Sequence, residues 1–316
     1  METLLVLAAR GLIAVVQRLP LLWVARLGRG IGGLAFWLDG RHRRVALDNL
    51  TLALGAERDP AARRALAAEN FRRIGENFAC AIRTAAMSDD EIRAVVTVAG
   101  AEKIGAATGD ARSCVVAIGH FGNFELYARG SLFVPGYQFA TTYRALRQPG
   151  LNRLFQDVRE RSGCLYFERR TDANALKEAM NRQRLMIGFL ADQHAGDRGV
   201  PAPFFGRECS TSAAPAVFAL RYQCPLLPAI CYRIAPGRWH VEVGDAIPTH
   251  EAGRPRPVEA IARDMNQAYE AAIRRDPANW FWVHRRWKTV HRRSRSDTPD
   301  PVAGGGSAPA SEPAVP

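Results

Sequence analysis

The sequence predicts an α/β protein with a single-layer, mixed and largely parallel sheet flanked by helices. Short apolar runs at 114–118 and 185–190, rich in aliphatic residues, are typical of buried strands. Between them, 150–161 and 173–184 carry the spacing of helices. Strands that alternate with helices in this way favour a largely parallel sheet. The chain has 316 residues, 47% of them apolar, which is enough for a substantial core.

Residues 1–40 form a mostly apolar segment that we expect to be helical, with a break near Pro20. Arginines interrupt it at short intervals, so no uninterrupted apolar run reaches the roughly 18–20 residues of a spanning helix. An interfacial or partly inserted helix fits this pattern, because arginine side chains can extend to anionic headgroups. The basic cluster at 41–44 adds an electrostatic attraction to such a surface. A packed helix pair around Pro20 is the alternative.

Residues 41–293 are expected to form one α/β domain. A helix is predicted over 60–87, and Ser88 begins the capping signal of a short helix after it. The other predicted elements are strands at 114–118, 139–143 and 185–190, helices at 150–161, 173–184 and 213–222, a hairpin of 226–234 with 240–243, and a final helix at 257–274. Residues 294–316 are rich in Pro, Ala and Gly and are predicted to be a disordered tail.

The charge balance indicates an anionic partner. The chain carries 43 Lys and Arg against 31 Asp and Glu, a net charge of +12. Such a field attracts nucleic acid, an anionic membrane surface or a phosphorylated substrate. The chain lacks the interleaved aromatic and basic motifs of nucleic-acid-binding proteins, so we do not expect that partner.

The six cysteines are scattered, with no C-x-x-C pair and no Cys/His cluster at zinc spacing. In a chain of this length such cysteines are typical of reduced, buried thiols in a cytosolic compartment. We therefore predict neither a disulfide framework nor a metal site.

The segment 119–125 directly follows the first buried strand and holds the strongest candidate for chemistry. Open α/β sheets place their active sites at the carboxyl ends of strands. His120 is suited to act as a general base near neutral pH, and a carboxylate can orient it. Glu125 can do so only if His120 lies in the turn and Glu125 in the first turn of a helix, which Gly119 and Gly122 permit. A core histidine beside a helix-start glutamate is the alternative.

The segment 119–125 resembles the H-x4-D/E signature of glycerolipid-type acyltransferases, and more closely the late acyltransferases of lipid A biosynthesis. Other blocks in the same order strengthen the resemblance, which spans about residues 20–290. They are 43–50 (R-x-x-x-x-x-N-L), 142–149 (Y-R-x-x-x-x-P), 188–194 (a strand ending in Asp-Gln), 200–206 (ending in Phe-Phe-Gly) and 280–288 (W-x-W-x-H-R-R-x-K).

The resemblance implies a glycerolipid acyltransferase-like fold and a catalytic role for His120. This histidine would deprotonate an acceptor hydroxyl, Glu125 would orient it, and direct transfer from an acyl carrier protein thioester would follow. Arg159 and Asp192 match positions that the family treats as functional. Arg159 would contact substrate phosphate or pair with Asp192. The remaining candidate substrate contacts are Asn123, Tyr143, Arg144, Gln193, Arg285 and Arg286. Packing is the alternative for Tyr143 and for the tryptophans of 280–288.

The expected reaction is acylation of a lipid A precursor without a metal or cofactor. Its partners would be acyl carrier protein, an anionic phosphorylated lipid and the cytoplasmic face of the bacterial inner membrane, where the enzyme would act as a monomer. Two alternatives stay open. The acceptor can be a lysophospholipid, an ornithine lipid or a phosphatidylinositol mannoside, or the chain can be a non-catalytic basic peripheral membrane protein.

Overall fold

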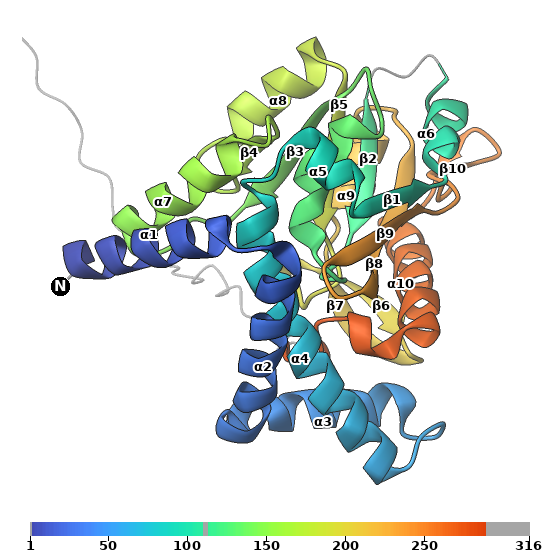
Figure 1. Ribbon diagram of the computed structural model, residues 1–316. Coiled ribbons are helices and arrows are strands. Elements are labelled where there is room, and N and C mark those ends of the chain that lie inside the picture. Colours follow the sequence, from blue (N-terminus) through green and yellow to red (C-terminus); the bar gives the residue numbers. More distant parts are fainter. Residues whose placement is uncertain (1, 110–112, 289–316) are drawn as a thin grey trace, which may run out of the picture.

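A seven-stranded sheet forms the centre of the computed structural model, which describes residues 2–109 and 113–288 (Figure 1). The strand order is β1-β9-β8-β2-β5-β3-β4. The strands are β1 (Val96–Ala99), β2 (Cys114–Ile118), β3 (Gln138–Tyr143), β4 (Leu165–Glu168), β5 (Leu185–Leu190), β8 (Leu226–Ala235) and β9 (Arg238–Val243). Neighbours run parallel except β8 and β9, which form an antiparallel hairpin. The predicted mixed, largely parallel sheet is confirmed.

Several short strands have no counterpart among the sequence predictions. They are β1 and β4 in the central sheet, the antiparallel pair β6 (Val200–Phe204) and β7 (Arg207–Thr211), and the pair β10 (His250–Glu251) and β11 (Arg254–Pro255). β1 and β4 have four residues each and are only partly buried. Strands this short carry too few residues for a pattern of alternation.

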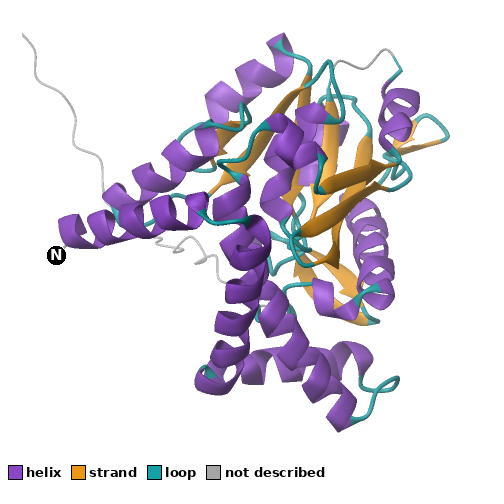
Figure 2. Cartoon of the chain, viewed as in Figure 1, coloured by secondary structure: helices purple, strands orange, loops and turns teal. Residues whose placement is uncertain are grey.

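Helices cover the sheet and extend away from it (Figure 2). They are α1 (Glu2–Arg18), α2 (Leu21–Leu38), α3 (Gly40–Leu54), α4 (Pro60–Thr84), α5 (Asp89–Arg93), α6 (Ala101–Thr108), α7 (Pro149–Glu160), α8 (Ala173–Arg182), α9 (Ala214–Arg221) and α10 (Val258–Arg275), with 3₁₀ turns η1 (Phe124–Leu132), η2 (Gly196–Arg198) and η3 (Pro277–Asn279). The predicted break near Pro20 is confirmed, as is the cap at Ser88. The predicted tail at 294–316 lies outside the described residues.

The N-terminal helices are joined to the domain by close packing. Glycines allow α2 to lie directly against α4: a Cβ at Gly32 would come within 2.1 Å of the Phe71 carbonyl oxygen. Arg29 of α2 makes salt bridges to Glu69 and Glu76 of α4, at 2.9 and 3.2 Å. This arginine was expected to extend toward lipid headgroups, but the two carboxylates hold it against α4.

The opposite faces of α1 and α2 remain apolar and exposed. Their exposed large apolar side chains are Leu4, Leu5, Leu7, Leu12, Val15, Leu22, Trp23, Leu27, Ile31, Leu34, Trp37 and Leu38. Within the described chain, α2 is the one helix long and apolar enough to span a membrane by length and composition, despite its two arginines. α1 extends alongside α7 (Figure 1), where the Glu2 carboxylate accepts the Gly150 N–H at 2.9 Å.

All six cysteines are buried as free thiols, as expected. Burial raises the pKa of Cys80, Cys164 and Cys231 to about 12. A thiol protonated at neutral pH is a poor nucleophile. The cysteines therefore belong to the packing of the core rather than to the chemistry.

Candidate active site

His120 and Asp192 meet because β2 and β5 are parallel neighbours that end in register. Ile118 pairs with Leu190, and the Ala191 N–H donates to the Ile118 carbonyl at 3.0 Å. Each candidate residue lies two positions beyond that last pair. The carboxyl ends of parallel strands share one edge of the sheet, so the two side chains reach the same point.

Three hydrogen bonds hold the Asp192 carboxylate, which is fully buried. Its Oδ1 lies 2.8 Å from His120 Nδ1, and its Oδ2 accepts the His120 backbone N–H at 2.9 Å. Trp280 Nε1 also donates to Oδ2, at 2.7 Å. Burial acts to raise the pKa of Asp192, but the His120 charge and these hydrogen bonds outweigh it and hold the pKa below its ordinary value. The ionised carboxylate places the proton of His120 on Nδ1 and leaves Nε2 as the basic nitrogen.

Two glycines make the turn around His120 possible. A Cβ at Gly119 would lie 2.7 Å from the Phe121 ring and 3.2 Å from the Asp192 carboxyl carbon. Gly122 has a φ of +51°, in the left-handed region, and its Cβ position lies 2.5 Å from the Cys231 carbonyl oxygen. Side chains at these positions would push His120 away from Asp192.

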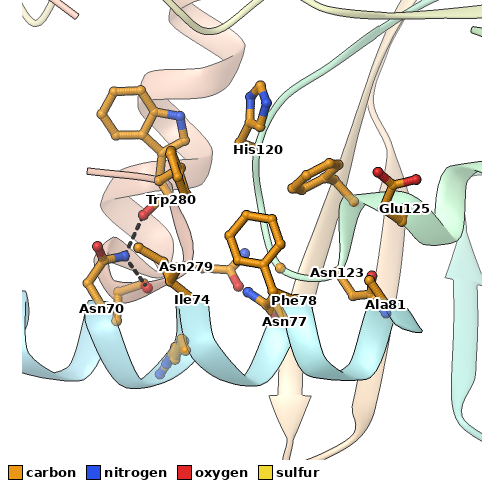
Figure 3. Close-up of a pocket in the computed structure, with 15 residues that line it drawn as sticks. Asn70, Ile74, Asn77, Phe78, Ala81, His120, Asn123, Glu125, Asn279 and Trp280 are labelled. Carbon is orange, nitrogen blue, oxygen red and sulfur yellow. Dashed lines mark hydrogen bonds between the residues drawn. The ribbon is translucent and has the colours of Figure 1, made fainter. Parts of the chain in front are cut away.

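Glu125 is not the carboxylate that contacts His120, which corrects the pairing expected from the sequence. Glu125 does lie in the first turn of η1, as anticipated. Its Oε1 accepts from Arg159 of α7 at 2.6 Å. Figure 3 shows the His120 imidazole and the Glu125 carboxylate standing apart. Among the described residues, the carboxylate hydrogen-bonded to His120 is that of Asp192.

Arg159 likewise does not pair with Asp192, which was one of the two roles considered. It pairs with Glu125 rather than with Asp192. Its guanidinium also lies 5.3 Å from the centroid of the Tyr166 ring. Burial acts to lower the pKa of Arg159, but the Glu125 charge and its hydrogen bond contribute to raising the pKa above its ordinary value. Both residues line a cavity, and because they form a salt bridge, the Glu125 carboxylate and the Arg159 guanidinium neutralise each other in its wall.

A cavity of about 840 Å³ opens beside His120. Glu125 and Arg159 line it, and so do three of the predicted substrate contacts, Tyr143, Arg144 and Gln193. Two arginines that the sequence patterns did not single out, Arg169 and Arg198, lie in the same wall. The volume is sufficient for part of a lipid or a similarly sized ligand.

The other predicted substrate contacts do not line this cavity. Asn123 is buried and its Nδ2 donates to Thr84 Oγ1 at 3.3 Å. Arg286 is also fully buried, and it donates to the Ser210 carbonyl at 2.6 Å. Arg285 is exposed and is not among the residues that line the cavity. Arg286 therefore does not present its guanidinium to a substrate in this structure, contrary to the expectation, because that group is enclosed in the core.

The C-terminal segment is tied to the site by residues that no sequence motif had marked for chemistry. Asn70 of α4 donates to the carbonyls of Ala278 and Trp280 across a small cavity of about 20 Å³ (Figure 3). This attachment places the Trp280 indole on Asp192. Trp280, for which core packing was the alternative in the sequence analysis, is thus also a hydrogen-bond donor to the site. No group of three potential metal ligands occurs within residues 2–109 and 113–288.

Comparison with known proteins identifies the family. A family model described as bacterial lipid A biosynthesis acyltransferase matches residues 2–289. The chain is 26% identical over 282 residues to the lipid A biosynthesis lauroyltransferase of Escherichia coli, covering 88% of this chain and 90% of that protein. It is 27% identical over 284 residues to the palmitoleoyltransferase of the same organism, covering 86% and 87%. It is also 26% identical over 226 residues to the phosphatidylinositol mannoside acyltransferase of Mycolicibacterium smegmatis, covering 69% and 72%. The motifs, the parallel sheet and this match over nearly the whole chain agree, and the protein belongs to the bacterial lipid A biosynthesis acyltransferase family.

Proposed function

We propose that this acyltransferase moves a fatty acyl chain from an acyl carrier protein thioester to a hydroxyl group of a lipid A precursor. The observation that carries the proposal is the His120–Asp192 pair at the edge of a cavity of about 840 Å³. A base oriented by a buried carboxylate, beside a cavity that can hold part of a lipid, suits the acylation of a lipid hydroxyl.

The chemistry needs one proton acceptor and no acyl-enzyme. His120 Nε2 accepts the proton of the acceptor hydroxyl while its oxygen bonds to the thioester carbonyl carbon. The carbon–sulfur bond then breaks, and the proton passes from His120 to the departing thiolate. Asp192 remains ionised throughout and stabilises the imidazolium that forms between the two steps.

The arginines of the cavity wall support an anionic acceptor. Arg144, Arg169 and Arg198 line the cavity and are exposed. Within the described chain, none of these three guanidinium groups makes a salt bridge, whereas Glu125 in the same wall is already paired with Arg159. The unpaired positive charge favours a phosphorylated lipid.

A second acceptor class follows from the mycobacterial relative. That protein is named for acylation of a phosphatidylinositol mannoside, and its identity to this chain equals that of the lauroyltransferase, 26% in each case. A mannoside lipid is also phosphorylated and would meet the same arginines. The acceptor therefore has to be decided by direct comparison of products.

The exposed apolar faces of α1 and α2 support a position at the cytoplasmic face of the bacterial inner membrane. Apolar side chains on these helices would enter the interface, and the charge of +12 would favour both anionic lipid and an acidic carrier protein. Acyl carrier protein would then reach the cavity of a monomeric enzyme from the aqueous side, and the lipid acceptor would reach it from the membrane side.

Mass spectrometry of lipid products tests the proposal. The purified protein is incubated with acyl carrier protein carrying mixed chain lengths and with either a lipid A precursor or a phosphatidylinositol mannoside. We expect the wild type to add one acyl mass to the lipid A precursor, and His120→Ala to add none. Acylation of the phosphatidylinositol mannoside alone would mean that this lipid, and not the lipid A precursor, is the acceptor. Equal amounts of product from His120→Ala and the wild type would overturn the proposed role of His120.

A further inference from the structure

His284 lies in the C-terminal segment and lines the same cavity as His120. Its backbone is held in place, because Asn49 Nδ2 donates to its carbonyl oxygen at 2.6 Å. Its ring is held as well: Nε2 accepts the backbone N–H of His194 at 3.0 Å. His194 follows Asp192 by two residues, so the ring is attached to the loop that carries the partner of His120.

This contact determines which nitrogen of His284 carries a proton. A backbone N–H only donates, so Nε2 must present a lone pair and a neutral ring has its hydrogen on Nδ1. Burial, together with the charges of His120, Arg286 and His194, lowers the pKa of His284 to about 4, against the opposing effect of Asp192. Among the described residues, Nδ1 has no hydrogen-bond partner and is not one of the enclosed unpaired atoms. The ring therefore offers one rigid neutral donor at the cavity wall.

We propose that His284 is a second catalytic residue, whose Nδ1–H donates to the carbonyl oxygen of the acyl donor. The inference rests on the proposed acyl transfer. As the acceptor oxygen bonds to the thioester carbon, the carbonyl electron pair moves onto oxygen, and a hydrogen bond from Nδ1–H stabilises that charge. When the carbon–sulfur bond breaks, the pair returns and the carbonyl re-forms. His284 keeps its proton throughout.

The cationic side chains of the cavity suit this task less well. Arg159 is bonded to Glu125. Arg144, Arg169 and Arg198 are exposed, and fixing a long exposed side chain costs conformational entropy, so they suit an anionic lipid headgroup better than a fixed position. A preorganised donor stabilises a developing oxyanion better than a mobile one, since it needs no reorganisation. A neutral imidazole also adds no positive charge that would weaken His120 as a base.

Two conservative substitutions separate catalysis from attachment of the loop. The side-chain amide of His284→Asn lies where Nδ1 was, so it keeps the donor and loses the contact with His194. The amide of His284→Gln reaches the position of Nε2, so it keeps the contact and loses the donor. We expect kcat to fall about 10²–10³-fold in His284→Gln with little change in KM, and less than about tenfold in His284→Asn.

The reverse order of activities would show that His284 only positions the loop and would overturn the inference, as would full activity in both variants. A wild-type enzyme that transfers no acyl chain would instead defeat the proposed function.

A measurement on the unaltered protein is independent of how the variants fold. Nitrogen-15 NMR of the histidine rings should show the His284 proton on Nδ1, and a proton on Nε2 would contradict the proposal.

Discussion

His120 owes its orientation to a buried carboxylate that three hydrogen bonds hold in place. Asp192 receives the His120 ring, the His120 backbone and the Trp280 indole, so both of its oxygens are occupied. An ionised group without water around it depends on such hydrogen bonds. Asp192 follows β5 and is hydrogen-bonded to both the turn that carries His120 and the Trp280 indole of the C-terminal segment. These contacts together fix the position of the carboxylate that orients the His120 imidazole.

Replacing Asp192 by asparagine should remove the orienting charge while nearly preserving shape. We expect kcat to fall about 10²–10⁴-fold, because the amide no longer stabilises the imidazolium or favours the proton on Nδ1. Steady-state acyl transfer, measured alongside thermal melting, checks this. Asp197→Asn, an exposed change in the same loop, should stay near wild-type activity. Similar acyl-transfer activity in Asp192→Asn and the wild type would show that the Asp192 charge is not needed to orient His120 or to stabilise the imidazolium.

The His284 ring predicts how stability depends on pH. In the unfolded chain it takes a proton near pH 6.5, whereas in the fold its pKa is about 4. Between these values the unfolded state binds more protons, so its contribution to stability is present above about pH 6.5 and is lost as pH falls toward 4. The Asp192 contribution, with its lowered pKa, is lost only at more acid pH.

Urea unfolding at about pH 7.5 and about pH 5 tests this sign. The wild-type midpoint should decrease on acidification, and the decrease should be smaller in His284→Gln, which has no titrating ring. Equal decreases in the two proteins would mean that His284 does not stay neutral in the fold.

At the scale of elements, the attachment of α2 to α4 depends on glycines that permit backbone contact. The Cβ of an alanine at Gly32 would lie 2.1 Å from a Phe71 carbonyl oxygen, whereas Gly30, one residue from Arg29 on the same helix, has nothing within 4 Å. The same chemical change therefore has opposite consequences two residues apart.

Gly32→Ala should destabilise the protein by about 1–3 kcal/mol, since α2 must move away from α4. Gly30→Ala should be neutral or stabilising by up to about 1 kcal/mol, because alanine favours the helix. Thermal melting in detergent compares the two. If Gly32→Ala melted with or above Gly30→Ala, the close contact of these helices would be wrong.

Across the whole molecule, the apolar faces of α1 and α2 and the cavity are parts of one continuous fold. α2 packs on α4, and α4 carries Asn70, which holds the segment that bears Trp280 (Figure 3). The exposed apolar surface of α1 and α2 is thus connected through one helix to the residues around His120.

Membrane attachment by α2 predicts a defined loss on removal of its apolar surface. Leu34 and Trp37 are 58% and 67% exposed. Burying such a side chain contributes about 1.5–3 kcal/mol, so Leu34→Ser with Trp37→Ser should weaken binding to vesicles containing anionic phospholipid roughly tenfold or more. Sedimentation with the vesicles measures this.

Val217→Ser on α9 provides the control, because that valine is also exposed at 43% but lies on another element. Its binding should match the wild type. Unchanged sedimentation of the Leu34 and Trp37 variant would indicate that this face of α2 does not enter the interface.

The local sequence determined most of the elements and their types. Apolar runs such as 114–118 predicted strands, and the caps at Ser88 and the break at Pro20 predicted helix ends, because these signals depend on neighbours along the chain. The same locality explains why His120 was found: it follows a strand and lies in a glycine turn. The family resemblance was confirmed by the match over residues 2–289.

Only the tertiary structure decided which groups meet. Glu125 is five residues from His120 and Asp192 is 72 residues away, yet Asp192 makes the contact, because β2 and β5 are neighbours in the sheet. Strand order is not encoded in any one segment, so the pairing could not be derived from spacing. Arg286 shows the converse: a charged residue in a basic motif suggested a surface, but packing of β7 and α10 around it made it part of the core.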